Sequence, residues 1–205
     1  RRSPQPRTDS PSLAARRPGT VWIETIASGG ALSDTNEPIG LDDAYNIETP
    51  DDSRHLYARW ADTYESEFIE PRGYVYHTGL AAEFVARGGS GPVLDVGCGT
   101  GVTGDALAAA GVRPIDGVDI APEMLAKAAE KLTESGDPVY RSLFVADLTS
   151  GTDIADGTYN GIVSTGAFTH GHLGPEPLHE LYRIAASGAH FAIGVNTQWF
   201  VDQGF

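Results

Sequence analysis

From residue 53 onward, short apolar runs alternate with amphipathic stretches. Short apolar runs predict buried strands, and apolar positions three or four residues apart predict helices. The predicted strands are residues 93–96, 114–118, 140–146, 161–164 and 189–195. The predicted helices are residues 73–87, 102–110, 122–134 and 176–186, after a first helix that begins near Ser53. Such alternation predicts an α/β fold with a mostly parallel sheet and helices on both faces.

The chain divides into three predicted segments. Residues 1–20 contain four prolines among Arg, Ser and Thr, with almost no large apolar side chains, and are predicted to be a disordered basic tail. Residues 21–52 place short apolar pieces between Gly, Pro, Asp and Asn, which predicts an irregular segment. Residues 53–205 form the predicted folded domain. Its first helix has Ser53 as the expected N-cap, followed by Leu56, Trp60 and Tyr64 at four-residue spacing.

The charge of the chain narrows the classes of partner. The formal net charge is −14, and because residues 1–20 carry five Arg against one Asp, the rest of the chain is near −18. A surface this acidic repels phosphate groups. We therefore expect neither a nucleic-acid nor a membrane partner. No apolar run reaches the roughly 18–20 residues that span a bilayer, and the single cysteine excludes an intrachain disulfide. We therefore expect a cytoplasmic protein.

The most specific motif lies after the strand at 93–96. Asp95 stands near its end, and glycines follow at 97, 99 and 101. Glycines allow a sharp turn and a close approach of a nucleotide-like ligand to the backbone. The motif therefore predicts a cofactor pocket at the first strand-to-helix crossover.

Two cofactors are compatible with this loop. Residues 99–104 match the dinucleotide pattern GxGxxG, and Asp119 lies 20 residues after Gly99, which favours an NAD(P)-dependent oxidoreductase. In a dinucleotide-binding fold, however, the first glycine directly follows the strand. That glycine is Gly97 here, and in its frame the third glycine position is Val102.

The other frame, Asp95-x-Gly97-x-Gly99-x-Gly101, resembles the first motif of class I S-adenosylmethionine-dependent methyltransferases. Residues 117–125, 146–148 and 156–167 resemble, in order, the second motif, the third motif and the run into strand four of that class. The resemblance implies a Rossmann-like fold with S-adenosylmethionine as cofactor. It implies that Asp119 accepts both ribose hydroxyls, for which a carboxylate with two oxygens is suited.

The resemblance implies roles for further residues. The methionine end of the cofactor is expected at Asp95, Gly97, Cys98, Gly99, Gly101 and Thr165. The adenine is expected beside Ile120, Met124, Asp147 and Leu148, with Asp147 accepting from its amino group. An N-cap role for Asp147 is the alternative. Cys98 has no evident base partner and is not expected to be a nucleophile.

Residues upstream of the glycine loop resemble a smaller group within this class. Tyr57-x-x-Trp60-Ala-x-x-Tyr64-Glu is similar to the N-terminal helix of the Williams–Beuren-region methyltransferase-like (methyltransferase-like 27) group, and residues 166–175 are similar to a segment of its bacterial relatives. This implies that Tyr57, Trp60 and Tyr64 contact the cofactor, with a place in the core as the alternative. Class I domains continue past strand five with an antiparallel hairpin, which we do not expect in these 205 residues.

His170 and His172 lie after predicted strand four, in the segment that typically faces the methyl acceptor. They are candidates for a general base. A metal site with His179 and a turn with solvated histidines are the alternatives, and we expect no metal. The sequence therefore predicts a methyltransferase that acts on a small-molecule acceptor. The remaining alternatives are an NAD(P)-dependent oxidoreductase and a catalytically silent S-adenosylmethionine-binding fragment.

Overall fold

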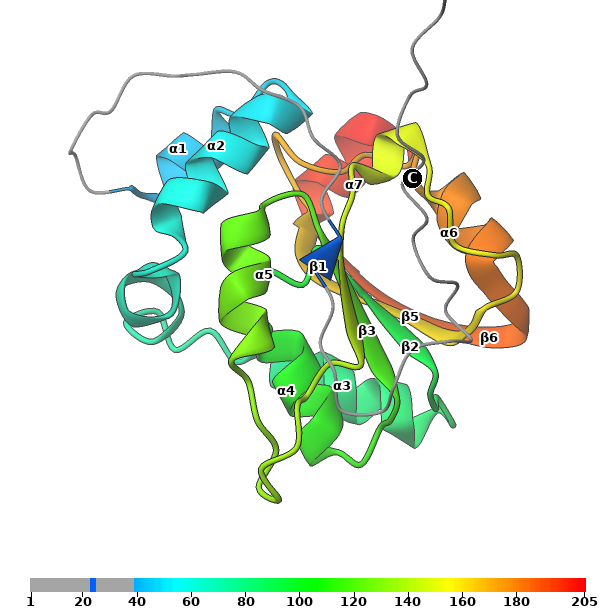
Figure 1. Ribbon diagram of the computed structural model, residues 1–205. Helices are drawn as coiled ribbons and strands as arrows, with labels where there is room; N and C mark the ends of the chain where they lie inside the picture. The colour runs from blue at the N-terminus through cyan, green and yellow to red at the C-terminus, as the bar shows by residue number, and fades with distance from the viewer. Residues whose placement is uncertain (1–22, 25–38) are drawn as a thin grey trace, which may run out of the picture.

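The computed structural model describes residues 23–24 and 39–205. Its described strands form one parallel sheet in the order β1-β4-β3-β2-β5-β6 (Figure 1). The strands are β1 (Ile23–Glu24), β2 (Val93–Val96), β3 (Ile115–Asp119), β4 (Ser142–Val145), β5 (Tyr159–Phe168) and β6 (Ala185–Val195). The prediction of a Rossmann-like α/β fold is confirmed.

Helices cover both faces of this sheet. They are α1 (Leu41–Tyr45), α2 (Pro50–Trp60), α3 (Tyr76–Ala86), α4 (Val102–Ala109), α5 (Pro122–Ala129), α6 (Leu178–Ile184) and α7 (Thr197–Gln203). A π-helix, η2 (Tyr64–Ile69), follows α2, and a 3₁₀ turn, η3 (Leu148–Ser150), follows β4. Among the described residues, no helix has the length and apolar character needed to cross a membrane.

Alternate residues along the strands supply two apolar cores. Val93 of β2 and Ile115 of β3 belong to a buried cluster with side chains of α3, α4 and α5. Leu94 and Val118 face the other way, into a cluster that includes Leu181 of α6. Because successive side chains of a strand point to opposite faces, β2 and β3 each supply apolar side chains to both layers.

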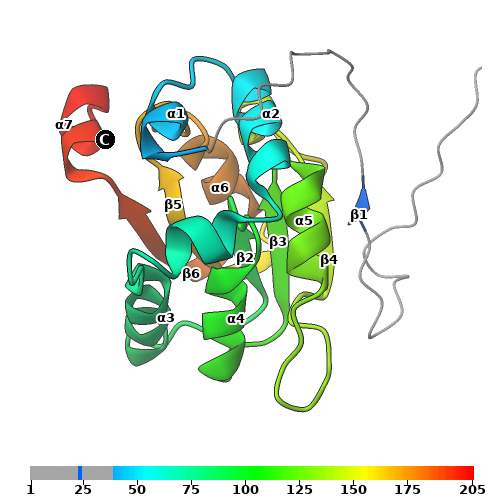
Figure 2. The same cartoon turned by 90° about the vertical axis from the view of Figure 1, so that its left-hand side faces the viewer.

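The strand order reverses between β2 and β5. The chain builds outward from β2 through β3 to β4, and then crosses back so that β5 pairs with the other edge of β2. In open parallel sheets, the crevice at such a reversal lies beyond the carboxyl ends of the strands and is where ligands bind. Figure 2 shows α1 and α2 above the sheet, with α7 set to one side. We call residues 39–69, which contain α1, α2 and η2, the cap.

A buried carboxylate joins the central strands away from that crevice. Asp116 of β3 is fully buried, and its two oxygens accept hydrogen bonds from the guanidinium of Arg141 at 3.0 and 2.5 Å. The hydroxyl of Tyr159, at the start of β5, donates to the same carboxylate at 2.9 Å. A buried charge is tolerated when it is paired and hydrogen-bonded in this way, so this network fixes β3 against its neighbours.

Several predicted boundaries are wrong. Helix α2 begins at Pro50, because Thr49 caps it with a reciprocal Asp52 bond and proline suits the first turn, so Ser53 lies inside the helix instead of capping it. Within the segment predicted to be irregular, residues 41–45 are helical. Helix α5 ends at Ala129 and not near residue 134, and the chain instead forms a bridge between Leu132 and Pro138. Residues 1–20 lie outside the described residues.

Helix α7 is absent from the sequence-based prediction. Asn196 caps it, since its side-chain oxygen accepts from the N–H groups of Gln198 and Trp199. The indole N–H of Trp199 donates to the carbonyl of Leu173 at 2.9 Å, which holds α7 against the segment after β5. This long-range contact stabilises a seven-residue helix that local sequence alone would not support.

Candidate functional site

The glycine loop follows β2 as the sequence predicts. Gly97, Gly99 and Gly101 have φ angles of +62°, +53° and +92°, a region that residues with a Cβ rarely adopt. A Cβ on Gly97 would lie 2.5 Å from the Cβ of Ala167 in β5, so the loop also packs too closely for a side chain there. Gly101 is the N-cap of α4. The three glycines therefore serve the backbone of the turn.

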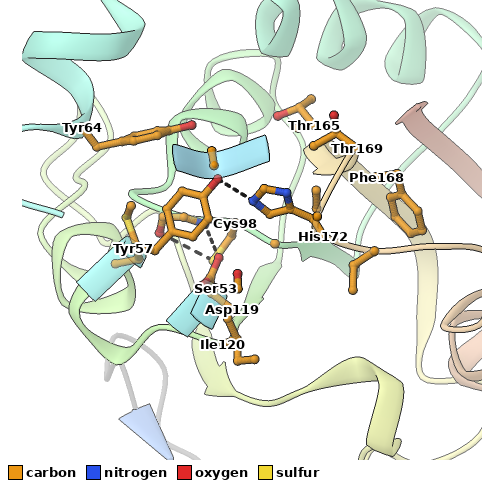
Figure 3. Close-up of a pocket in the computed structure, with 18 of the residues that line it drawn as sticks. Ser53, Tyr57, Tyr64, Cys98, Asp119, Ile120, Thr165, Phe168, Thr169 and His172 are labelled. Carbon is orange, nitrogen blue, oxygen red and sulfur yellow. Dashed lines mark hydrogen bonds between the residues drawn. The ribbon is translucent and has the colours of Figure 1, made fainter. Parts of the chain in front are cut away.

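A cavity of about 550 Å³ lies between this loop and the cap. It is lined by the loop, by the segments after β3, β4 and β5, by the end of β6 and by α1, α2 and η2 (Figure 3). The sequence-predicted residues that line it are Tyr57, Trp60, Tyr64, Gly97, Cys98, Gly99, Asp119, Ile120, Met124, Asp147, Leu148, Thr165 and His172. The fold thus brings together residues that are spread over more than half of the chain.

Three predicted site residues, Asp95, Gly101 and His170, are not among the residues that line this cavity. Asp95 is fully buried in β2, where its Oδ2 accepts a hydrogen bond from the hydroxyl of Tyr140 at 2.7 Å. Burial raises the pKa of Asp95 to about 7, an effect strengthened by the nearby Asp119 carboxylate and opposed by the Tyr140 hydrogen bond. The structure thus places Asp95 behind the glycine loop, and its predicted contact with the cofactor stays a prediction.

Asp119 ends β3 at the floor of the cavity. Its Oδ2 accepts from the backbone N–H of Gly99 at 2.8 Å, and its Oδ1 accepts from the N–H of Ala121 at 2.9 Å. Burial raises the pKa of Asp119, and these backbone hydrogen bonds oppose the rise. Each carboxylate oxygen can accept a second hydrogen bond, so two vicinal hydroxyl donors could still be bound.

Asp147 and Cys98 both line the cavity, and each has a local structural role. Asp147 caps η3, with its Oδ1 accepting from the backbone N–H of Thr149 at 2.9 Å. The N-cap alternative is therefore confirmed, while its contact with adenine stays a prediction. Burial raises the pKa of the Cys98 thiol well above its usual value, which keeps the sulfur neutral and poorly nucleophilic.

The cap contributes an aromatic wall. Trp60 is 2% exposed and packs with Ala121 and Met124, and its ring contacts Tyr64 edge-on with centroids 5.1 Å apart. Tyr64 in turn stacks on Phe68 at 5.3 Å. Trp60 and Tyr64 thus belong to the core of the cap and to the cavity wall, so the two interpretations of these residues are compatible.

Tyr57 and His172 meet across the cavity (Figure 3). The phenol oxygen of Tyr57 lies 2.8 Å from Nε2 of His172, and Nδ1 of His172 lies 2.7 Å from the carbonyl oxygen of His170. Because a carbonyl only accepts, Nδ1 carries the proton in this pair. Burial lowers the pKa of His172, so the ring is neutral and its Nε2 accepts from the Tyr57 hydroxyl.

His170 is instead placed between aromatic rings. Its ring lies 5.4 Å from that of Tyr45 and 5.0 Å from that of Trp199. Within residues 23–24 and 39–205, no three His, Cys, Asp or Glu side chains converge as a metal site would require. His170 therefore acts on the site through its carbonyl group, which orients His172.

The charges around the cavity have one sign. Glu48, Asp119 and Asp147 line it, and the described lining residues include neither Lys nor Arg. Such a cavity disfavours phosphate or carboxylate ligands and favours cationic or neutral ones. The two lysines form ion pairs outside the cavity. Lys127 pairs with Asp62 and Lys131 pairs with Glu65, each at 2.8 Å.

Sequence reasoning missed part of the cavity lining. Tyr45, Tyr74, Tyr76, Phe68 and Asn196 also line it. Phe68 could have been found, because it continues the four-residue spacing of Trp60 and Tyr64. No sequence signal that we recognise marks Asn196, which reaches the cavity only through the pairing of β6 with β5.

The comparisons with known proteins agree with this geometry. Residues 93–188 match a family described as "Methyltransferase domain". The human protein "Methyltransferase-like protein 27" is 27% identical over 171 residues, which cover 78% of this chain and 64% of that protein. A Bos taurus 18S rRNA (guanine-N(7))-methyltransferase is 36% identical over 92 residues, 44% of this chain and 30% of that protein.

A solved structure shares the fold. It is of a Methanococcus maripaludis protein described as an S-adenosyl-L-methionine-dependent methyltransferase, with 23% identity and a TM-score of 0.54 over 72% of this chain and 67% of that chain. The chain spans less than two thirds of the length of the two curated relatives. The predicted resemblance to class I S-adenosylmethionine-dependent methyltransferases is confirmed.

Proposed function

We propose that this chain, whose domain is of the class I S-adenosylmethionine-dependent methyltransferase type, transfers a methyl group to a small-molecule acceptor. The observation that carries the proposal is the cavity in which Asp119 and the glycine loop face the aromatic cap. The carboxylate of Asp119 suits a cofactor with a ribose, and most of the other lining side chains are apolar or aromatic.

The residues present fit the cofactor. Gly99 leaves its surroundings open, since a Cβ there would meet no atom within 4 Å, and the backbone can therefore approach a ligand. Asp119 retains acceptor capacity for two ribose hydroxyls. Ile120, Met124 and Leu148 offer apolar surface beside it for an adenine ring. The carboxylates favour a ligand with a positive sulfonium.

The catalytic work of the protein would be mainly positioning. The bound cofactor supplies an already activated methyl group. The chain has to hold an acceptor atom in line with it at about 3–3.5 Å and to exclude competing water. Trp60 and Tyr57 of α2, with Tyr64 of η2, would close the site from above, since their rings form its cap-side wall.

The charge of the chain and of the cavity lining distinguishes a small acceptor from an RNA acceptor. The bovine relative is named for a ribosomal RNA substrate. Here the net charge is −14, and neither Lys nor Arg occurs among the described lining residues, whereas RNA-binding surfaces are rich in both. A small acceptor that enters the cavity is therefore favoured over RNA. A cytoplasmic location is part of the same proposal.

Calorimetric titration with S-adenosylhomocysteine, and separately with NADH, tests the cofactor part. We expect saturable binding of S-adenosylhomocysteine and none of NADH, and the reverse would support the oxidoreductase alternative. A metabolite panel, with an 18S rRNA fragment as a separate arm, is then assayed for release of S-adenosylhomocysteine. Turnover of RNA alone would overturn the small-molecule part, and binding without any turnover would support a catalytically silent protein.

A further inference from the structure

Tyr57 and His172 both line the cavity and are joined by a hydrogen bond across it (Figure 3). The carbonyl of His170 fixes the proton of His172 on Nδ1, which leaves the lone pair of Nε2 pointing at the Tyr57 hydroxyl. Tyr57 therefore donates its proton to His172. Tyr57 lines the cavity, and its oxygen keeps lone pairs that can accept a hydrogen bond from a ligand.

The sequence predicts Tyr57 as a cofactor contact, but this geometry supports a more specific role. We propose that Tyr57 and His172 form a proton-accepting pair that selects a neutral, planar, hydroxylated acceptor of the phenol class and removes its proton during O-methylation. This inference rests on the proposed function, since it names the acceptor of the same site.

The need for a base favours oxygen as the attacking atom. A neutral amine can be methylated first and can lose its proton to water afterwards. A hydroxyl oxygen is a weak nucleophile until its proton leaves, so a positioned base accelerates only this reaction substantially. An already ionised acceptor, such as a carboxylate, would instead need a nearby cation, and the described lining residues provide none.

The aromatic side chains that line the cavity indicate the shape of the acceptor. Aromatic rings of Tyr45, Tyr74, Tyr76 and Phe168 line the cavity together with Tyr57. The rings of Tyr74 and Tyr76 lie 6.3 Å apart, and Tyr76 lies against Gly194 of β6, where any Cβ would come within 2.4 Å of its ring. Flat apolar walls of this kind favour stacking of a planar ring.

The step balances without an external reagent. The acceptor O–H bond breaks, its proton passes to the Tyr57 oxygen, and the Tyr57 proton passes to Nε2 of His172. The acceptor oxygen forms the new O–CH₃ bond while the S–CH₃ bond breaks and leaves its electron pair on sulfur. The products are a methyl ether, S-adenosylhomocysteine and an imidazolium, which then releases its proton to water.

Binding of ring probes tests the selection by a readout other than turnover. Phenol, anisole and benzoate are titrated into the protein saturated with S-adenosylhomocysteine. We expect phenol to bind at least about tenfold more tightly than anisole, since loss of a hydrogen-bond donor to a buried acceptor is costly. We expect no detectable binding of benzoate. Equal affinity for phenol and anisole, or tighter binding of benzoate, would overturn the proposal.

Two variants test the pair. Tyr57→Phe should reduce the affinity for phenol to that for anisole and leave anisole binding unchanged. His172→Gln should lower the O-methylation of phenol by about 10²-fold or more, with a smaller effect on phenol binding. Tyr182→Phe on the exposed surface of α6, and His179→Asn, are matched controls outside the cavity and should behave as the wild type.

The outcomes separate this inference from the proposed function. If the wild type binds S-adenosylhomocysteine but Tyr57→Phe keeps full affinity for phenol, the acceptor proposal is wrong and the methyltransferase proposal stands. If the wild type fails to bind S-adenosylhomocysteine, both proposals are wrong. His172→Gln also covers the case in which Tyr57→Phe does not fold, since either variant with unchanged phenol turnover overturns the proton-accepting role.

Discussion

The carboxylate of Asp119 accepts a hydrogen bond from the backbone N–H of Gly99, with 2.8 Å between Oδ2 and the nitrogen. This bond joins the end of β3 to the glycine loop after β2. The residue expected to hold the ribose therefore also sets the shape of the loop expected to hold the methionine end. We therefore expect the two parts of the candidate cofactor site to be energetically coupled.

The first prediction concerns this coupling. Asp119→Ala should weaken S-adenosylhomocysteine binding by more than tenfold, about 1.4 kcal/mol or more, because both the ribose acceptor and the loop contact are lost. Calorimetry on the folded variant measures it. Asp153→Ala, at an exposed position outside the cavity, is the control and should bind normally. Unchanged affinity in Asp119→Ala would remove this residue from the site.

The second prediction separates two glycines of one loop. Gly99→Ala places a Cβ in open space at a positive φ, which should lower the free energy of unfolding by about 1–2 kcal/mol. Gly97→Ala adds a clash with Ala167 and should cost about 1–3 kcal/mol more. Urea unfolding measures both values. S-adenosylhomocysteine affinity should nevertheless fall in Gly99→Ala, whose new methyl group occupies ligand space. Equal stability of the two variants contradicts this account.

The third prediction concerns the attachment of the cap to α5. Lys131 and Glu65 are both partly buried, whereas Asp62, the partner of Lys127, is largely exposed. A double-mutant cycle with Lys131→Gln and Glu65→Gln should give a coupling free energy below about 1 kcal/mol that shrinks in high salt. Lys131→Gln should also speed amide hydrogen exchange in η2. The matched variant Lys127→Gln should have the smaller effect there, and the opposite order would contradict the structure.

The fourth prediction concerns the pH dependence of stability. The pKa of Asp95 rises to about 7 in the folded protein, so between about pH 4 and pH 7 the folded state holds a proton that the unfolded state has released. The stabilising contribution of Asp95 is therefore complete below its unfolded pKa and is lost as the pH rises through the folded value. Tyr140, Cys98 and Asp119 are the ionisable groups that face it.

Comparison with Asp95→Asn isolates this contribution. From pH 5 to pH 7, the free energy of unfolding of the wild type minus that of Asp95→Asn should fall by about 2–3 kcal/mol. Urea unfolding at several pH values measures the difference, in which the contributions of groups that do not interact with Asp95 cancel. A difference that is constant or rises with pH would show that Asp95 is ionised in the folded state.

Most of the central sheet could be predicted from the sequence. Strand β2 has the predicted bounds, because a short apolar run next to a glycine turn has few other ways to fold. Helix ends were harder to predict. Pro122 correctly marks the start of α5, but the chain leaves the helix at Ala129 to pair Leu132 with Pro138, a contact that depends on the turn between them.

The candidate site also has parts that the sequence predicts and parts that depend on packing. Asp119 and the glycines could be placed because they follow strands whose carboxyl ends meet at one edge of the sheet. The hydrogen bond between Tyr57 and His172 joins residues 115 positions apart and depends on how the cap docks. The position of Asp95 just before the glycine loop predicts a contact with the cofactor. In the structure, however, its carboxylate is buried and accepts a hydrogen bond from Tyr140, 45 residues later. Such partners follow from packing, which local patterns do not encode.

Both lysines of the 205 residues form ion pairs with the cap, one through Asp62 and the other through Glu65. Among side chains, an amine-reactive fluorophore or an isotopically labelled methyl reagent would therefore modify only the junction between cap and α5. Binding of a ligand beneath the cap would then be detected as a change in the rate at which Lys127 and Lys131 react with the label. The scarcity of lysine thus gives this protein a built-in reporter position, with no engineered cysteine required.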